Sequence, residues 1–191
     1  MQETYIQDKT FNKTDFVQYP LAKGDYESCI FNGCNFSNND LSEFKFIDCE
    51  FNGCNWSLVK LNKTVLRDVI FKDCKMLGLQ FNSCSPFGLA FSFDNCQLDH
   101  SSFYNTKIKK TVFKNSQLLE ADFEACDLTG AVLDNCNLAG AVFESTLLEK
   151  ADFRTSFNYS VDPEINKIKK AKFSLSGIAG LLDKYDIYIE K

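Results

Sequence analysis

A large apolar residue recurs at every fifth position along most of this chain. From Phe11 every fifth residue through Phe81 is large and apolar, and the same count resumes at Phe93 and runs to Phe153. All 28 positions of the two registers are apolar, although only 45% of the sequence is hydrophobic. An α-helix repeats every 3.6 residues and a strand alternates every two, so neither element produces this period. The period predicts a chain that turns a corner every five residues, with the large side chain of each side pointing inward.

In the latter half of the chain, from Cys96 to Ala151, a small residue stands two positions before each large one, and eight of the nine cysteines occupy the corresponding place along the whole chain. The ninth, Cys84, occupies it too if the first register is extended to Pro86. Zinc sites gather their ligands through short C-x-x-C spacings, whereas these cysteines are spaced in multiples of five. The single histidine, His100, falls at an outward position. We therefore interpret the cysteines as small core residues and expect no metal and no cofactor, with a thiol-based metal or redox protein as the alternative.

The phrase "CIFNGCNF" at residues 29–36 returns as "CEFNGCNW" at residues 49–56, twenty residues later. If four sides make one coil, the second phrase lies directly on the first at strand spacing, about 4.8 Å. Phe31 then stacks on Phe51 and Phe36 on Trp56, while Asn32 forms an amide ladder with Asn52. The inner column of small residues contains Cys34, Cys54 and Cys74.

Composition limits the class of protein. At 191 residues the chain is long enough for one substantial domain. It has no apolar run of membrane-spanning length, and its first residues lack the pattern of a secretory signal. We expect a cytoplasmic protein without membrane contact. The net charge of −5 disfavours direct binding to nucleic acid.

The segment "ADFEACDLTGAVLDNCNLAGAVFE" at residues 121–144 resembles the A(D/N)LXX motif of the pentapeptide-repeat family. The resemblance covers about residues 11–155 and implies an all-β fold, a right-handed quadrilateral β-helix of about seven coils. We expect an N-terminal cap with irregular repeats at 1–25 and two half-solenoids at 26–81 and 93–155. Residues 82–92 form a slip between them, and residues 156–191 form a C-terminal cap and dimerisation segment.

The slip adds two residues to the count and contains Pro86, Phe87 and Gly88. Proline and glycine together indicate a bulge or a short outward loop, and an accommodated kink between the two halves is the equal alternative.

The repeat is expected to stop at Phe153, and the residues that follow have a different pattern. Asp162 and Pro163 are expected to break the coil. A helix capped by Ser174 or Ser176, followed by a short strand at 186–190, is predicted there. Its apolar residues are expected to pair two chains tail to tail, and a monomeric cap is the alternative. The expected dimer residues are Ile178, Leu181, Leu182, Tyr185 and Ile187.

Residues 115–149 contain seven acids and no lysine or arginine. Counting in twenties places Glu124 and Glu144 one coil apart on one face, with Asp122 beside them. These three, with neighbouring Glu120 and Asp127, are the candidate partner contacts, although a solvated face is the simpler interpretation of carboxylates. Another face alternates in sign through Asp94, Lys114, Asp134 and Arg154, which favours structural cross-strand pairs.

The tail "DPEINKIKKAKFS" followed by "GIAGLLDKYDI" is similar to that of the McbG microcin-immunity and Qnr quinolone-resistance group. The resemblance implies a non-enzymatic homodimer that mimics DNA, binds DNA gyrase or topoisomerase IV and protects it from a poison. Qnr proteins interrupt their coils with two outward loops, whereas this chain has only the short slip. A microcin or natural-product poison therefore fits as well as a quinolone, and a scaffold for an unrelated protein partner is the alternative function.

Overall fold

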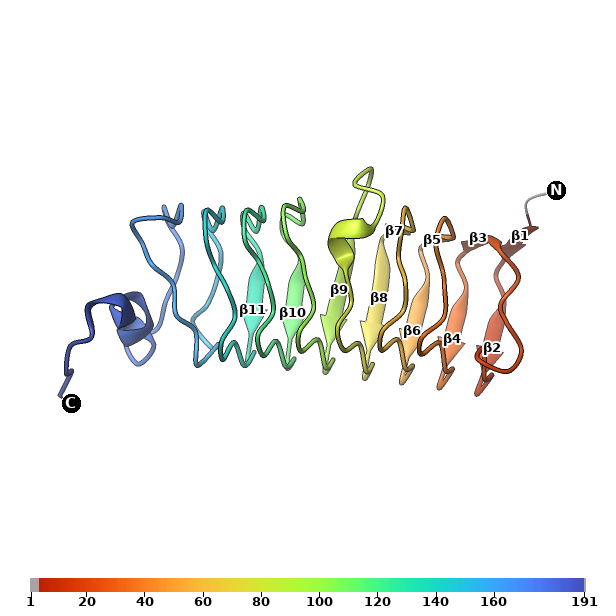
Figure 1. The fold of residues 1–191 in the computed structure, drawn as a ribbon, viewed down its shortest axis with the longest axis horizontal. Coiled ribbons are helices and arrows are strands. Elements are labelled where there is room, and N and C mark those ends of the chain that lie inside the picture. The colour runs from red at the N-terminus through yellow and green to blue at the C-terminus, as the bar shows by residue number, and fades with distance from the viewer. Residues whose placement is uncertain (1–3, 191) are drawn as a thin grey trace.

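The structure is a computed structural model that describes residues 4–190. Its chain winds into a long rod, with the two termini at opposite ends (Figure 1). The rod is an all-β parallel solenoid of about seven turns, as the period of five predicts.

Two parallel sheets run along the rod. The first has the order β1-β3-β5-β7, and its strands are β1 (Thr4–Gln7), β3 (Gly24–Glu27), β5 (Lys45–Ile47) and β7 (Val65–Arg67). The second has the order β11-β10-β9-β8-β6-β4-β2. Its strands are β2 (Thr10–Asn12), β4 (Ile30–Asn32), β6 (Glu50–Asn52), β8 (Val69–Lys72), β9 (Phe91–Asp94), β10 (Val112–Lys114) and β11 (Val132–Asp134).

Each coil therefore presents four faces, which we number in chain order. The first face carries β1, β3, β5 and β7 and continues through residues 107, 127, 147 and 167. The second carries β2 and its six partners. Isolated bridges hold the third face, as in Asn35↔Asn55, and the fourth, as in Ser102↔Asp122 and Asp122↔Val142.

The corners explain the asparagine, aspartate and glycine between the large residues. At most corners the residue two places after the large one has a positive φ, as at Gly33 (60°), Asn38 (59°) and Asp48 (51°). Only glycine, and to a lesser degree Asn and Asp, enters this left-handed region readily. Other corners place other residue types in the same region, as at Lys63 (57°) and Ala125 (55°), so the turn does not depend on these three residue types alone.

Stacked rings fill the interior, as the twenty-residue repeat predicts. The rings of Phe31 and Phe51 stack at 4.6 Å, and those of Phe36 and Trp56 lie 5.1 Å apart. The Asn32 side chain donates to Asn12 and accepts from Asn52 at 2.9 and 3.0 Å, which confirms the amide ladder. Burial of each fully buried Phe side chain stabilises the folded state by about 1.5–3 kcal/mol. The interior is thus filled with side chains, and the outer faces are the accessible surface.

All nine cysteines are buried free thiols. In the predicted inner column, the Cys54 and Cys74 thiols donate to the carbonyls of Phe31 and Phe51, both at 3.2 Å. Burial raises the pKa of Cys49 to about 12, away from the reactive thiolate form. Between residues 4 and 190, no group of three or more His, Cys, Asp or Glu side chains is placed to hold a metal ion.

Residues 82–92 include an outward loop. The chain passes a short 3-10 turn, η1 (Phe81–Ser83), and then projects from the rod beside β9 (Figure 1). Pro86, Phe87 and Gly88 are exposed, and Phe87 retains 79% of its surface. The coil closes again below the loop, because the Ala90 amide donates to the Leu66 carbonyl at 2.9 Å.

The ladder does not stop at Phe153. Bridges Leu147↔Lys167 and Asp152↔Lys172 add another coil, and the Phe173 ring stacks on Phe153 at 5.4 Å. Asn166 permits this extension, because it takes the small inward place above Thr146 and its buried amide donates to the Phe143 carbonyl at 2.7 Å. A polar residue with its hydrogen bonds made can thus replace the small apolar one.

The expected C-terminal helix and strand are wrong. The segment holds only two 3-10 turns, η2 (Ile178–Leu181) and η3 (Asp183–Tyr185), and residues 186–190 form no strand. The Val161 amide donates to the Gly180 carbonyl at 2.8 Å, and a Cβ at Gly180 would lie 2.1 Å from the Tyr159 carbonyl oxygen. This close approach ties the turn to the last coil, and glycines disfavour a regular helix. Within the described range, no helix is both long and apolar enough to cross a membrane.

Candidate functional site

The fourth face carries an acidic patch, which we define as Asp122, Glu124 and Glu144. The Ala125 amide donates to the Glu144 carbonyl at 2.8 Å, which sets Glu124 and Glu144 one coil apart in one column. Both glutamates are exposed, and Asp122 is half-buried beside them. None of the three carboxylates forms an ion pair with a described residue. The structure thus brings together three of the five predicted contact residues.

Asp122 is fixed in place, whereas the two glutamates are not. The Asp122 carboxylate accepts a hydrogen bond from the Ser102 hydroxyl and another from the Glu124 amide, both at 2.9 Å. No hydrogen bond joins the Glu124 or Glu144 carboxylate to any side chain of residues 4–190. These two carboxylates keep their full capacity to accept bonds from a partner.

Glu120 and Asp127 do not join the patch. Glu120 lies on the third face, where its carboxylate is 3.2 Å from Nδ1 of His100. Asp127 lies on the first face and is only 7% exposed. Burial raises its pKa, but hydrogen bonds from the hydroxyl and amide of Thr129, at 2.6 and 3.1 Å, outweigh burial and lower the pKa overall. Asp127 also pairs with Lys109 at 3.2 Å, so it has a structural role.

Most other charges that meet across coils are of opposite sign. Lys45 pairs with Asp25 at 2.9 Å, and Lys72 with Glu50 at 3.5 Å. Like charges directly opposite one another destabilise a sheet. The column of Glu124 and Glu144 departs from this pattern and therefore carries a cost to folding.

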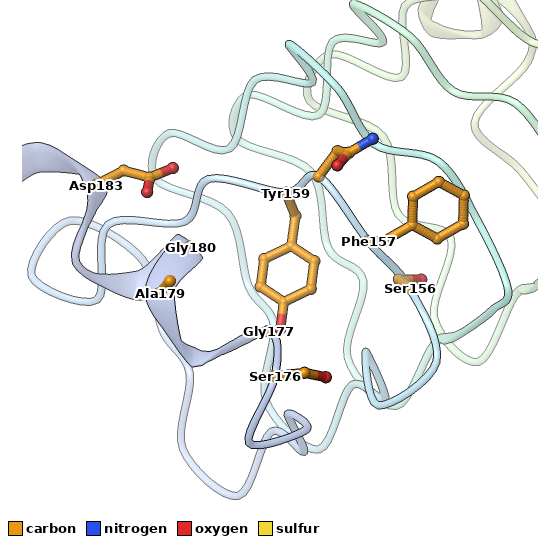
Figure 2. A pocket seen from close by; sticks show the side chains of 9 residues that line it. Ser156, Phe157, Tyr159, Ser176, Gly177, Ala179, Gly180 and Asp183 are labelled. Atoms are coloured by element: carbon orange, nitrogen blue, oxygen red, sulfur yellow. The ribbon is translucent and has the colours of Figure 1, made fainter. Parts of the chain in front are cut away.

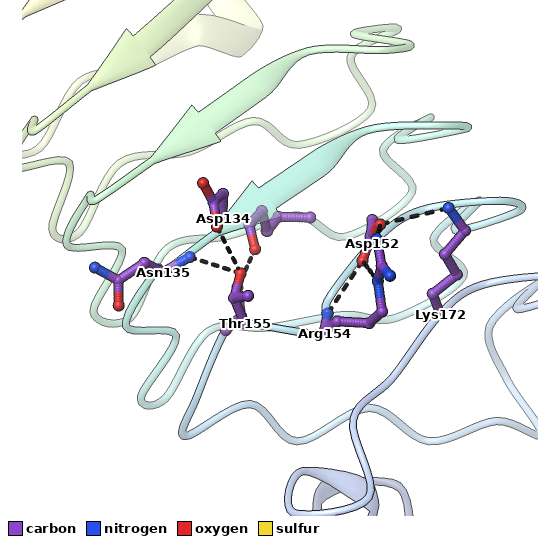
Figure 3. Close-up of polar contacts among 8 residues, drawn as sticks. Asp134, Asn135, Asp152, Arg154, Thr155 and Lys172 are labelled. Atoms are coloured by element: carbon purple, nitrogen blue, oxygen red, sulfur yellow. Dashed lines mark hydrogen bonds and ion pairs between the residues drawn. The ribbon is translucent and has the colours of Figure 1, made fainter.

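The second face behaves as a structural surface (Figure 3). Lys114 pairs with Asp94 at 3.6 Å, as the alternating signs predict. Arg154, however, pairs with Asp152 of its own coil at 2.7 Å, because the two residues are separated by one position. Asp134 instead accepts from the Thr155 hydroxyl at 2.8 Å. The bond from Arg154 lowers the pKa of Asp152 to about 2.

The C-terminal end exposes apolar side chains. Among the expected dimer residues, Ile178, Tyr185 and Ile187 are 45%, 51% and 56% exposed. Leu181 and Leu182 are half-buried, and Leu181 packs against the core of its own chain. The side chains of Leu175 and Tyr188 are also exposed, at 89% and 101%, although neither was among the expected dimer residues.

A cavity of about 430 Å³ lies between the last coil and these turns (Figure 2). Only Tyr159 and Asp183 of its lining side chains titrate. The Tyr159 ring points toward Gly177, and its buried hydroxyl has no hydrogen-bond partner among the described residues. The lining offers no pairing of a nucleophile with a base.

Comparison with known proteins agrees with this geometry. The family profile described as "Pentapeptide repeat region" matches residues 24–91 and 80–153. No curated protein matches the sequence significantly.

The solved structures that share the fold include two of trypsin-treated variants of QnrB1, described as a plasmid-mediated fluoroquinolone resistance protein. The first is 15% identical with a TM-score of 0.75, and the match covers 98% of this chain and 92% of that one. The second is also 15% identical with a TM-score of 0.62, covering 98% of this chain and 100% of that one. The matched residues span more than half of the sequence, and the chain belongs to the pentapeptide-repeat family.

Proposed function

We propose that this protein is a non-enzymatic DNA mimic that binds a type II topoisomerase, DNA gyrase or topoisomerase IV, and protects it from a poison. The observation that carries the proposal is the acidic patch, whose carboxylates form no ion pair with any residue of the range 4–190 and lie on a long rod (Figure 1). The protein would act in the cytoplasm, where such an enzyme meets its DNA.

The physical basis is the match between two regular arrays of negative charge. Duplex DNA carries one charge per roughly 1.7 Å of axis, and proteins that bind it line their grooves with lysine and arginine. Glu124 and Glu144 repeat along the rod at strand spacing, about 4.8 Å. Such a column presents negative charges to the lysines and arginines of a DNA-binding groove. It contains no phosphodiester bond, so the rod can occupy the groove without being cleaved by the enzyme.

The fold likeness to QnrB1 supports the proposal, because that protein is described as a fluoroquinolone resistance protein. The projecting loop of Pro86, Phe87 and Gly88 provides a second contact, since Phe87 is largely exposed. The proposal covers three classes of poison, which are microcins, natural products and quinolones. We also propose a tail-to-tail homodimer through Ile178, Tyr185 and Ile187, since these apolar residues are uncovered in one chain.

The test is a supercoiling and poison-protection assay with purified gyrase and topoisomerase IV. The variant Asp122→Lys/Glu124→Lys/Glu144→Lys should lose protection, because it replaces every carboxylate of the patch. The matched control is Asp8→Lys/Asp48→Lys/Asp68→Lys, which makes the same charge change at exposed corners of the first face. The control should keep protection.

Equal loss in both variants would mean that only net charge matters, which contradicts the assignment of the patch. No binding of the unmodified protein to either enzyme at micromolar concentration would favour a scaffold for another protein. For the dimer, a light-scattering mass of one chain would refute the pairing of tails.

A further inference from the structure

The first face carries a second set of like charges toward its C-terminal end. Bridges join Lys107, Asp127, Leu147 and Lys167 in one column, so the lysines around them share this face. We define the lysine face by its exposed members, which are Lys107, Lys109, Lys110, Lys150, Lys167, Lys169 and Lys170. Seven lysines against Asp127 and Glu149 give the face a charge of +5, in a chain of net charge −5.

Most of these lysines form no ion pair with a described residue, and several lie close together. Of the seven, Lys109 alone forms an ion pair with a carboxylate in the described part of the chain, and its partner is Asp127. The Lys150 amide donates to the Lys169 carbonyl at 3.0 Å, which places Lys150 one coil from Lys170. Like charges at this spacing oppose folding. Most charges that meet across coils elsewhere are of opposite sign, although Asp48 and Asp68 also lie one coil apart. The lysine face differs by its excess of five positive charges, and we attribute that excess to binding.

The chemistry of the face favours carboxylates over nucleic acid. Its outward positions between residues 107 and 170 contain no arginine for bidentate phosphate contacts and no aromatic ring for base stacking. The acidic patch lies on the adjoining face, across a corner of uncharged Asn105, Ala125 and Ser145. A duplex is about 20 Å wide, so on the lysine face its phosphates would come within a Debye length, about 8 Å, of that patch. A narrower acidic segment avoids this repulsion.

We propose that the lysine face binds an extended acidic segment of a protein partner. Lys107 and Lys167 lie three coils apart, so the segment spans about 14 Å at strand spacing. The lysine face and the acidic patch meet at one corner and together form a surface with a positive half and a negative half. This surface fits a partner that presents an acidic segment beside a basic groove. The proposal goes beyond the proposed function and does not depend on the partner being a topoisomerase.

The probe is a fluorescein-labelled glutamate-glycine peptide of roughly ten residues, measured by anisotropy at about 50 mM salt. The test variant is Lys110→Glu/Lys150→Glu/Lys170→Glu, which reverses one column of the face. The matched control is Lys13→Glu/Lys63→Glu/Lys75→Glu, which reverses exposed lysines on the three other faces. The test variant should weaken peptide binding at least roughly tenfold, and the control by less than about twofold.

Two further measurements locate the bound segment. Carbodiimide coupling of the peptide should label Lys110, Lys150 and Lys170 and leave Lys13, Lys63 and Lys75 largely unmodified. The test variant should melt close to the unmodified protein, since it exchanges one like-charge column for another of opposite sign, so loss of binding would not reflect unfolding.

Equal weakening by the two variants, or no peptide binding by the unmodified protein, would overturn the proposal. Lysine-dependent binding of a duplex of about 20 base pairs, without peptide binding, would assign the face to nucleic acid instead. Reversal of Asp122, Glu124 and Glu144 should not weaken peptide binding. Failure of topoisomerase protection is therefore distinguishable from failure of this inference.

Discussion

Glu144→Lys should stabilise the rod, although it removes a residue that we assign to partner binding. In the native column Glu144 faces Glu124 across one coil, and no cation in residues 4–190 neutralises either side chain through an ion pair. A lysine at this position would convert the repulsion into an attraction. The variant therefore separates the effect of the patch on folding stability from its effect on partner binding.

The magnitude follows from the spacing of the coils. Two unit charges about 5 Å apart interact by about 0.8 kcal/mol in water. Screening in 0.15 M salt reduces this to about half, and reversal of the sign counts the interaction twice. We expect a gain of about 0.5–1 kcal/mol in the free energy of unfolding. For a chain of this length that gain raises the melting temperature by about 1–4 °C.

The assay is thermal unfolding followed by circular dichroism, in about 0.15 M and about 1 M salt. Glu144→Gln is the control, because it removes the repulsion without adding an attraction and should give about half the shift. Both shifts should shrink at high salt, while Glu144→Lys still weakens topoisomerase protection. A lower melting temperature for Glu144→Lys, or a shift that salt does not change, would refute the like-charge reasoning.

Three other predictions follow from single contacts. Phe123→Ala should lower the free energy of unfolding by about 3–5 kcal/mol in a denaturant titration, because the ring is fully buried between stacked neighbours. Gly180→Ala should release the C-terminal turn from Tyr159, giving faster tail proteolysis and, if the tail pairs chains, a lower light-scattering mass. Asp152 has a pKa of about 2, below its unfolded value near 3.9, so its contact with Arg154 stabilises the fold above about pH 4 and is lost as pH falls toward 2. Asp152→Asn should therefore flatten the acid limb of a stability-versus-pH curve.

The coil could be predicted because one local rule repeats. Each side needs a large inward residue, and a corner residue that tolerates a positive φ follows it. Stacking at twenty residues then needs no further information, as Phe31 and Phe51 show. The end of the rod was not predictable in this way. Asn166 is polar, and its acceptance into the core depends on the Phe143 carbonyl, which a periodic count does not include.

The C-terminal turns differ from the predicted helix for a tertiary reason. The spacing of Ile178, Leu181, Leu182 and Tyr185 matches a helical stripe, but the turn must approach the Tyr159 backbone closely. That contact lies outside the local sequence. The pattern therefore indicated an apolar cap without determining its conformation.

The two charged faces differed in how far they could be foreseen. Counting in twenties was enough to place Glu124 beside Glu144, because both lie inside the recognised repeat. Lys167 and Lys170 lie beyond Phe153, where the repeat was expected to stop. The alignment of Lys167 with Lys107, and of Lys170 with Lys150, therefore emerges only when the ladder is followed to its end.

Cross-coil charge offers a physical criterion for function on a rod whose interior is filled. Every outward side chain has a neighbour about 4.8 Å above or below it, so a random pairing of like charges is opposed by folding. Most charged columns here obey that preference, as Lys114 with Asp94 does. The acidic patch and the lysine face both violate it, with opposite signs, on faces that share one corner. The repulsion within the acidic patch and the repulsion within the lysine face both oppose folding, and both occur beside the same corner. A single partner that contacts both faces explains the two together, because its binding would neutralise both sets of charges.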